Sequence, residues 1–128
     1  MKISIRLLVI LISAVTVFSG ILQVVRPEFV LGIIGAETTD TAAHFFAIIG
    51  MFMALFGAMM LHAVYSSYPN QAAILYASLQ KLGAALAVGL GVISGIFSFV
   101  AIGVAVFDLF SGLLFLYYLQ SQKVYEVY

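Results

Sequence analysis

The stretch KLGAALAVGLGVISGIFSFVAIGVAVFD, Lys81 to Asp108, has a cation at one end, an anion at the other and no charged residue between them. As a single helix, the uncharged part alone would be about 39 Å long at 1.5 Å per residue. The hydrocarbon core of a bilayer is only about 30 Å thick. We therefore expect a hairpin near Ser94, Gly95 and Ile96, where glycine can adopt backbone angles that other residues avoid. A single long, tilted helix is the alternative.

This hairpin would bring Lys81 and Asp108 to the same level of two antiparallel helices. Lys81 lies 14 residues before Gly95 (95 − 81) and Asp108 lies 13 after it (108 − 95), which corresponds to about 21 and 20 Å of helix. An isolated charge at the centre of a membrane helix costs about 2.5–3.5 kcal/mol. We therefore predict an intramembrane ion pair. Small residues on the two faces would allow close approach: Ala77, Ala84 and Ala85 beside Lys81, and Ala101, Ala105, Ser111 and Gly112 beside Asp108.

The role of this predicted polar centre has three interpretations. The pair holds two helices in register, or it is a functional polar centre, because ionisable residues inside membranes are functional-site hypotheses by default. In the third, the ammonium group of Lys81 extends to the lipid headgroups and makes no direct contact with Asp108.

The composition places the whole chain in the membrane class. Of its 128 residues, 65% are hydrophobic and only 8% are charged, whereas soluble domains average about 45–50% apolar and about 25% charged residues. A water-soluble fold of this size cannot hide so much apolar surface. We therefore predict an all-α integral membrane protein that forms a single domain over residues 1–128.

Four apolar segments have the length of about 20 residues that a membrane helix needs. They cover about residues 7–25, 42–65, 72–93 and 97–119, and we expect them to form an up-down-up-down bundle. Pro27 disfavours helix at Arg26 and should end the first segment, while Thr39, Asp40 or Thr41 should cap the second. The first segment also has the pattern of a signal peptide; we interpret it as a retained helix.

Basic residues near the segment ends indicate the orientation. Lys2, Arg6 and Lys123 fall on the same side as the loop at Pro69 and Asn70, and Arg26 falls alone on the other. This predicts a multi-pass protein of the inner (plasma) membrane with both termini in the cytoplasm.

Stripes of small residues at every fourth position predict further helix-packing surfaces. One stripe comprises Gly83, Ala87, Gly91 and Gly95, and another comprises Gly50, Ala54 and Ala58.

The two histidines are candidate contacts for a cofactor. His44 and His62 are 18 residues apart (62 − 44) on the second segment, so they share a helix face but lie about 27 Å apart. They cannot bind one metal ion within a chain, and haem or a pigment would need a further ligand from another helix or subunit. Hydrogen bonding at the membrane interface, for His44 with Asp40 one turn earlier, is the simpler interpretation. Gln80 is a third candidate ligand contact.

No catalytic residue or metal site is predicted. Nucleophile-elbow, Walker, Rossmann and His-Glu-x-x-His patterns are absent from the sequence. The chain has no cysteine and a net charge of zero, so thiolate chemistry is excluded and the basic patch of a nucleic-acid binder is missing.

Three stretches carry a resemblance to a known family: RPEFVLGIIG (26–35), FFAIIGMFMALFGAMML (45–61) and LQKLGAALAVGLGVISGIFSFVAIGVAVFDLF (79–110). In layout and composition the chain resembles the DoxX-like group of small bacterial membrane proteins with four helices, which includes subunits of terminal quinol oxidation. The resemblance implies a small accessory subunit rather than a stand-alone enzyme. It assigns no role to any individual residue.

Two functional hypotheses follow, and a third, a membrane enzyme, is disfavoured because the chain has so few polar residues. The first is a non-enzymatic membrane protein that acts as an accessory or structural subunit of a larger complex or homo-oligomer, or binds lipid-like molecules such as quinones or pigments. The alternative is a small ion- or proton-coupled transporter or channel that uses the pair of Lys81 and Asp108.

Overall fold

The computed structural model describes residues 4–67 and 70–126, and these form five helices. They are α1 (Ile5–Val25), α2 (Pro27–Ile33), α3 (Asp40–Tyr65), α4 (Gln71–Ile93) and α5 (Ala101–Glu126). All except α2 are long and apolar enough to cross a membrane. The prediction of an all-helical protein with four such helices is confirmed, and the short α2 is an addition to it.

The boundary between α1 and α2 follows from a proline. Arg26 ends α1 and has φ −134°, outside the helical range, while Pro27 is the first residue of α2. Proline suits this first position because its fixed φ is already helical, and it disfavours helix at the residue before it. At the start of α3, the side chain of Thr39 accepts a hydrogen bond from the Ala42 N–H at 3.1 Å, which confirms one of the predicted caps.

The predicted hairpin between α4 and α5 is present. Gly95 has φ +77°, a left-handed conformation that glycine adopts without a steric penalty. The N–H groups of Ile96 and Phe97 then donate to the Gly91 carbonyl at 2.8 and 3.2 Å. Since Phe97 takes part in closing the end of α4, it does not start the next helix. The predicted start at residue 97 is therefore wrong, and α5 begins at Ala101.

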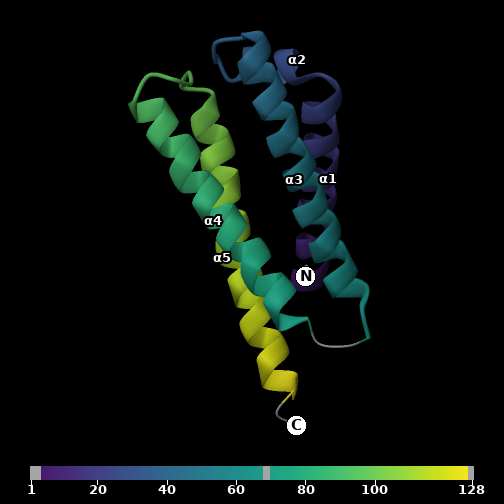
Figure 1. Ribbon diagram of the computed structural model, residues 1–128. Helices are drawn as coiled ribbons and strands as arrows, with labels where there is room; N and C mark the ends of the chain where they lie inside the picture. Colours follow the sequence, from purple (N-terminus) through teal and green to yellow (C-terminus); the bar gives the residue numbers. More distant parts are fainter. Residues whose placement is uncertain (1–3, 68–69, 127–128) are drawn as a thin grey trace.

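The long helices associate as two closely packed pairs, α1 with α3 and α4 with α5 (Figure 1). Glycines make this packing close. A Cβ atom added to Gly20 of α1 would lie 2.6 Å from both the Ala54 nitrogen and the Gly50 oxygen of α3, and one added to Gly112 of α5 would lie 2.7 Å from the Leu82 side chain of α4. Small residues let helix backbones approach in this way.

The predicted small-residue stripes have different outcomes. Gly50 and Ala54 lie in the interface with α1, although Ala58 is exposed. The prediction for the α4 stripe is wrong at Gly83, Ala87 and Gly95. A Cβ atom on Gly83 or Gly95 would meet nothing within 4 Å, and Ala87 is exposed. A stripe of small residues permits close helix approach but does not by itself supply a partner.

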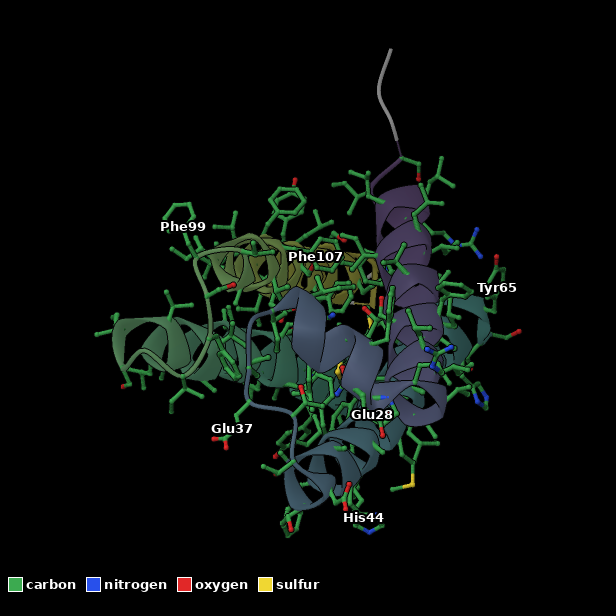
Figure 2. The ribbon with its side chains drawn as sticks, turned by 90° about the horizontal axis from the view of Figure 1, so that it is seen from above. Glu28, Glu37, His44, Tyr65, Phe99 and Phe107 are labelled. Atoms are coloured by element: carbon green, nitrogen blue, oxygen red, sulfur yellow. The ribbon has the colours of Figure 1, made fainter. Side chains whose placement is uncertain are left out.

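The two pairs meet mainly at one end of the molecule, the lower end in Figure 1. A cluster of buried apolar side chains lies there, with members from all four long helices: Val9, Ile12, Met60, Val64, Ile74, Ala77, Phe115, Tyr118 and Leu119. At the opposite end, the N–H of Ser98 donates to the carbonyl of Ile34 at 2.8 Å. Figure 2 looks down on that end, where α2 packs against α1 and α3.

Part of the orientation prediction depends on residues that are not described. Lys2 and Pro69 lie outside the described residues, and the side chain of Lys123 is also outside them. Arg6, which is described, lies at the lower end, with its guanidinium 5.2 Å from the centroid of the Tyr65 ring.

Candidate functional site

The most unusual side chain among the described residues is a lysine buried between helices. Lys81, on α4, is only 3% exposed. Its Nζ atom donates hydrogen bonds to Asp108 Oδ1 at 3.3 Å and to Thr16 Oγ1 at 2.7 Å, and it lies 5.3 Å from the centroid of the Phe107 ring. Buried charges are tolerated when they are paired and hydrogen-bonded, and Lys81 meets both conditions. The predicted contact between Lys81 and Asp108 is present.

The burial of this pair argues against the interpretation in which the Lys81 side chain extends to the membrane surface. The side chains of Lys81 and Asp108 are only 4% and 11% exposed. The ammonium group therefore points between the helices, and the interpretation in which it reaches the headgroups without contacting Asp108 is wrong.

Thr16 is the partner that the sequence analysis missed. It lies on α1, and its hydroxyl donates to the Ile12 carbonyl at 2.9 Å while accepting from Lys81. Lys81 thus binds α5 within its own helix pair and α1 in the other pair. A sequence signal for this contact exists. Ser13, Thr16, Gly20 and Gln23 are spaced by three and four residues, which places them on one face of a helix, and all four are buried in the structure.

The buried serine hydroxyls of α4 and α5 are satisfied within their own helices. Ser78 donates to the Ile74 carbonyl and Ser111 to the Phe107 carbonyl, each at 2.7 Å. Bonding to the carbonyl four residues earlier is the usual way for a hydroxyl to be satisfied inside a helix. Gln23 instead joins two helices, because its Nε2 donates to the Phe46 carbonyl of α3 at 2.9 Å.

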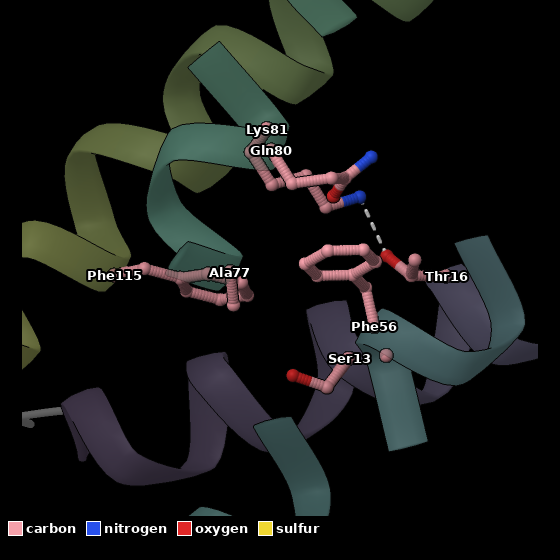
Figure 3. A pocket seen from close by; sticks show the side chains of 8 residues that line it. Ser13, Thr16, Phe56, Ala77, Gln80, Lys81 and Phe115 are labelled. Atoms are coloured by element: carbon pink, nitrogen blue, oxygen red, sulfur yellow. Dashed lines mark hydrogen bonds between the residues drawn. The ribbon is translucent and has the colours of Figure 1, made fainter. Parts of the chain in front are cut away.

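A narrow crevice separates the two helix pairs beside Lys81 (Figure 3). It comprises about 180 Å³ of space between atoms, including space outside the molecule, and leaves no room for a water molecule. Its lining comes from all four long helices: Ser13, Thr16, Phe56, Gly57, Ala77, Gln80, Lys81 and Phe115. Two polar atoms of this lining, Ser13 Oγ and Gln80 Oε1, are buried without a hydrogen-bond partner.

The structure separates the three candidate cofactor contacts. His44 and His62 are both exposed, and His44 lies at the edge of the bundle in Figure 2. Only Gln80 lies in the crevice with Lys81. Within residues 4–67 and 70–126, no group of three or more histidine, cysteine or acidic side chains could hold a metal ion, and no hydrogen bond joins Asp40 to His44. Any haem or pigment bound by the histidines would lie outside the crevice.

Comparisons with protein-family models, curated proteins and solved structures gave no match to this chain. The protein is therefore described by its own features. It is an all-helical chain with four potential membrane spans, and a buried lysine joins its two helix pairs. The resemblance to the DoxX-like group remains a prediction.

Proposed function

We propose that the chain crosses the inner (plasma) membrane four times, as an up-down-up-down bundle with both termini in the cytoplasm. The outward faces of the long helices support this. They expose large apolar side chains such as Phe18 (71% exposed), Leu86 (66%) and Phe110 (56%). Soluble monomers rarely expose contiguous apolar surface on this scale. In a bilayer, acyl chains would cover it.

Labelling of single cysteines tests this topology, since the natural chain contains none. A cysteine replacing Glu37, in the loop before α3, should react with an impermeant maleimide on intact cells or spheroplasts. One replacing Ser67, after α3, should react only after the membrane is opened. The reverse pattern, or equal reaction of both in intact membranes, would contradict the topology.

Within that membrane, the chain acts in our proposal as a non-enzymatic accessory or structural subunit of a larger complex or a homo-oligomer, or as a binder of lipid-like molecules such as quinones or pigments. One observation supports this function: the charged side chains of the spans contact each other and Thr16, as expected of a pair that serves helix packing. Lys81 is bonded to both Thr16 and Asp108, and these residues link α4 to the other pair and to α5. The resemblance to the DoxX-like group agrees with an accessory role.

Gentle extraction from the native membrane tests this role. The tagged protein, solubilised with a styrene–maleic acid copolymer, should elute with other membrane subunits or further copies in a fixed ratio, or with an enriched lipid-like molecule. A monomer that carries only lipids in bulk proportion would contradict the proposal.

The buried ion pair also supports the second candidate function, a small transporter or channel. Neutralising Asp108 would break the pair and alter the contact between the helix pairs. The lack of room for water beside Lys81 counts against an open pathway. In proteoliposomes, an ion or proton flux that is lost in Asp108→Asn would favour transport. No flux above that of empty liposomes would favour the accessory role.

A further inference from the structure

Two buried oxygen atoms, one from each helix pair, lie at the crevice without a hydrogen-bond partner. Ser13, on α1, is completely buried, and its Oγ atom makes no hydrogen bond within the described part of the chain. Gln80, on α4, is half-buried, but its Oε1 atom is buried and equally unpartnered. Both side chains line the crevice between the pairs, and Figure 3 shows the Phe56 ring between them. Most buried polar groups in proteins have a hydrogen-bond partner. Two unpartnered oxygens in the same crevice therefore suggest that a further group supplies their hydrogen bonds.

The neighbouring groups do not supply that partner. Lys81 uses two of its three N–H donors on Thr16 and Asp108 and makes no hydrogen bond to Gln80 Oε1, and the Thr16 hydroxyl donates to the Ile12 carbonyl. The crevice as it stands has no room for a water molecule. What the two atoms require is therefore definite: Gln80 Oε1 can only accept and needs a donor, whereas the Ser13 hydroxyl can donate or accept.

The charge of the site limits what can supply these bonds. The ammonium of Lys81 is balanced by the carboxylate of Asp108 at 3.3 Å. An anionic headgroup would add an unpaired charge to a buried site, which is strongly disfavoured. A hydroxyl group adds no charge and provides the donor that Gln80 lacks.

We propose that the crevice is a binding site for an uncharged amphiphile with a hydroxyl headgroup, which enters from the bilayer between the two helix pairs. Its hydroxyl donates to Gln80 Oε1 and bonds with Ser13 Oγ, while its apolar part lies against the rings of Phe56 and Phe115. Phe56 is half-buried, so rotation of its side chain toward the lipid makes the space. The inference rests on the membrane insertion proposed above, but not on the accessory role.

Photo-crosslinking in nanodiscs tests the site. The full-length protein is inserted into phosphatidylcholine nanodiscs and labelled with 1-dodecanol that carries a diazirine in its chain. Unlabelled competitors are 1-dodecanol, 1-methoxydodecane, which accepts but cannot donate a hydrogen bond, and dodecanoate, which is anionic. We expect 1-dodecanol alone to compete, and the label to fall on residues that line the crevice.

Variants separate specific binding from partitioning into the bilayer. Ser13→Ala and Gln80→Leu should each weaken competition by 1-dodecanol about two- to tenfold, the range for one neutral hydrogen bond. The double variant should lose it. Ser111→Ala is the matched control, because that hydroxyl is satisfied within its own helix, and it should behave like the natural protein. Ser13→Ala and Gln80→Leu each remove an unpartnered oxygen, so neither should impair folding.

The outcomes distinguish this inference from the membrane proposal. Failure of the natural protein to enter nanodiscs would refute both. Insertion with labelling that 1-dodecanol does not reduce, that methoxydodecane reduces equally, or that persists in the double variant would refute the hydroxyl site and leave the membrane proposal intact.

Discussion

Replacing Asp108 by asparagine removes one charge of the buried pair and leaves the shape of the side chain nearly unchanged. Two unit charges 3.3 Å apart attract each other by about 5 kcal/mol at an effective dielectric constant of about 20. Asparagine still offers an oxygen to Lys81, and Thr16 still accepts from it, so part of the interaction survives. Losing one partner of a buried ion pair typically costs about 3–5 kcal/mol, and we expect Asp108→Asn to lower the free energy of unfolding by that amount.

The double variant Lys81→Met with Asp108→Leu should recover this loss. Replacing both members of a buried pair with apolar side chains is often neutral or stabilising, because neither charge then has to be buried. Methionine at position 81 can keep a contact with the Phe107 ring. Thr16 is not left unsatisfied, since its hydroxyl donates to the Ile12 carbonyl. We expect the double variant to lie within about 1 kcal/mol of the natural protein, or above it.

The assay is reversible unfolding in mixed micelles, with the fraction of sodium dodecyl sulfate as denaturant and helix content from circular dichroism. Asp40→Asn is the control, because Asp40 is exposed in the first turn of α3 and should cost less than about 1 kcal/mol. A loss below about 1 kcal/mol for Asp108→Asn, or a double variant no more stable than Asp108→Asn, would refute the reasoning.

The same assay tests three further contacts. Gly20→Leu should cost about 1–3 kcal/mol or more, because its Cβ atom would lie 2.6 Å from the backbone of α3. Gly83→Leu is the control: a Cβ atom there meets nothing within 4 Å, so stability should change by less than about 0.5 kcal/mol. Thr16→Val removes a hydrogen bond to the charged Lys81 and should cost about 1.5–3 kcal/mol. Gln23→Leu removes a neutral bond between α1 and α3 and should cost only about 0.6 kcal/mol. If Gln23→Leu proves as costly as Thr16→Val, the assignment of Thr16 to the charged site is contradicted.

The fold was largely predictable because helices long and apolar enough to cross a membrane are recognisable from local sequence. Long apolar runs predicted both ends of three of the four long helices to within about two residues, and Pro27 set the end of α1. The turn at Gly95 followed from the mismatch between helix length and bilayer thickness. The start of α5 was missed because residues 96 and 97 are used to close the end of α4, and such capping is not visible in a hydropathy pattern.

The candidate site was predictable only within the hairpin. Lys81 and Asp108 lie at nearly equal distances along the chain from Gly95, so a local turn was enough to bring them together. Thr16 is distant in sequence and reaches Lys81 through the packing of one helix pair on the other, which no local spacing determines. The same limit explains Gly83 and Ala87: a small-residue face allows a neighbour, but the packing of the whole bundle decides which face receives one.

The central claim is that Lys81 is bonded both to Asp108 of its own helix pair and to Thr16 of the other pair when the protein lies in a bilayer. Solid-state NMR of the protein in bilayers tests it directly, through dipolar recoupling between ¹⁵Nζ of lysine and ¹³C of aspartate and threonine. We predict strong coupling of the Lys81 nitrogen to both the Asp108 carboxyl carbon and the Thr16 Cβ. Coupling instead to lipid phosphorus or bulk water, with neither side chain in contact, would contradict the account.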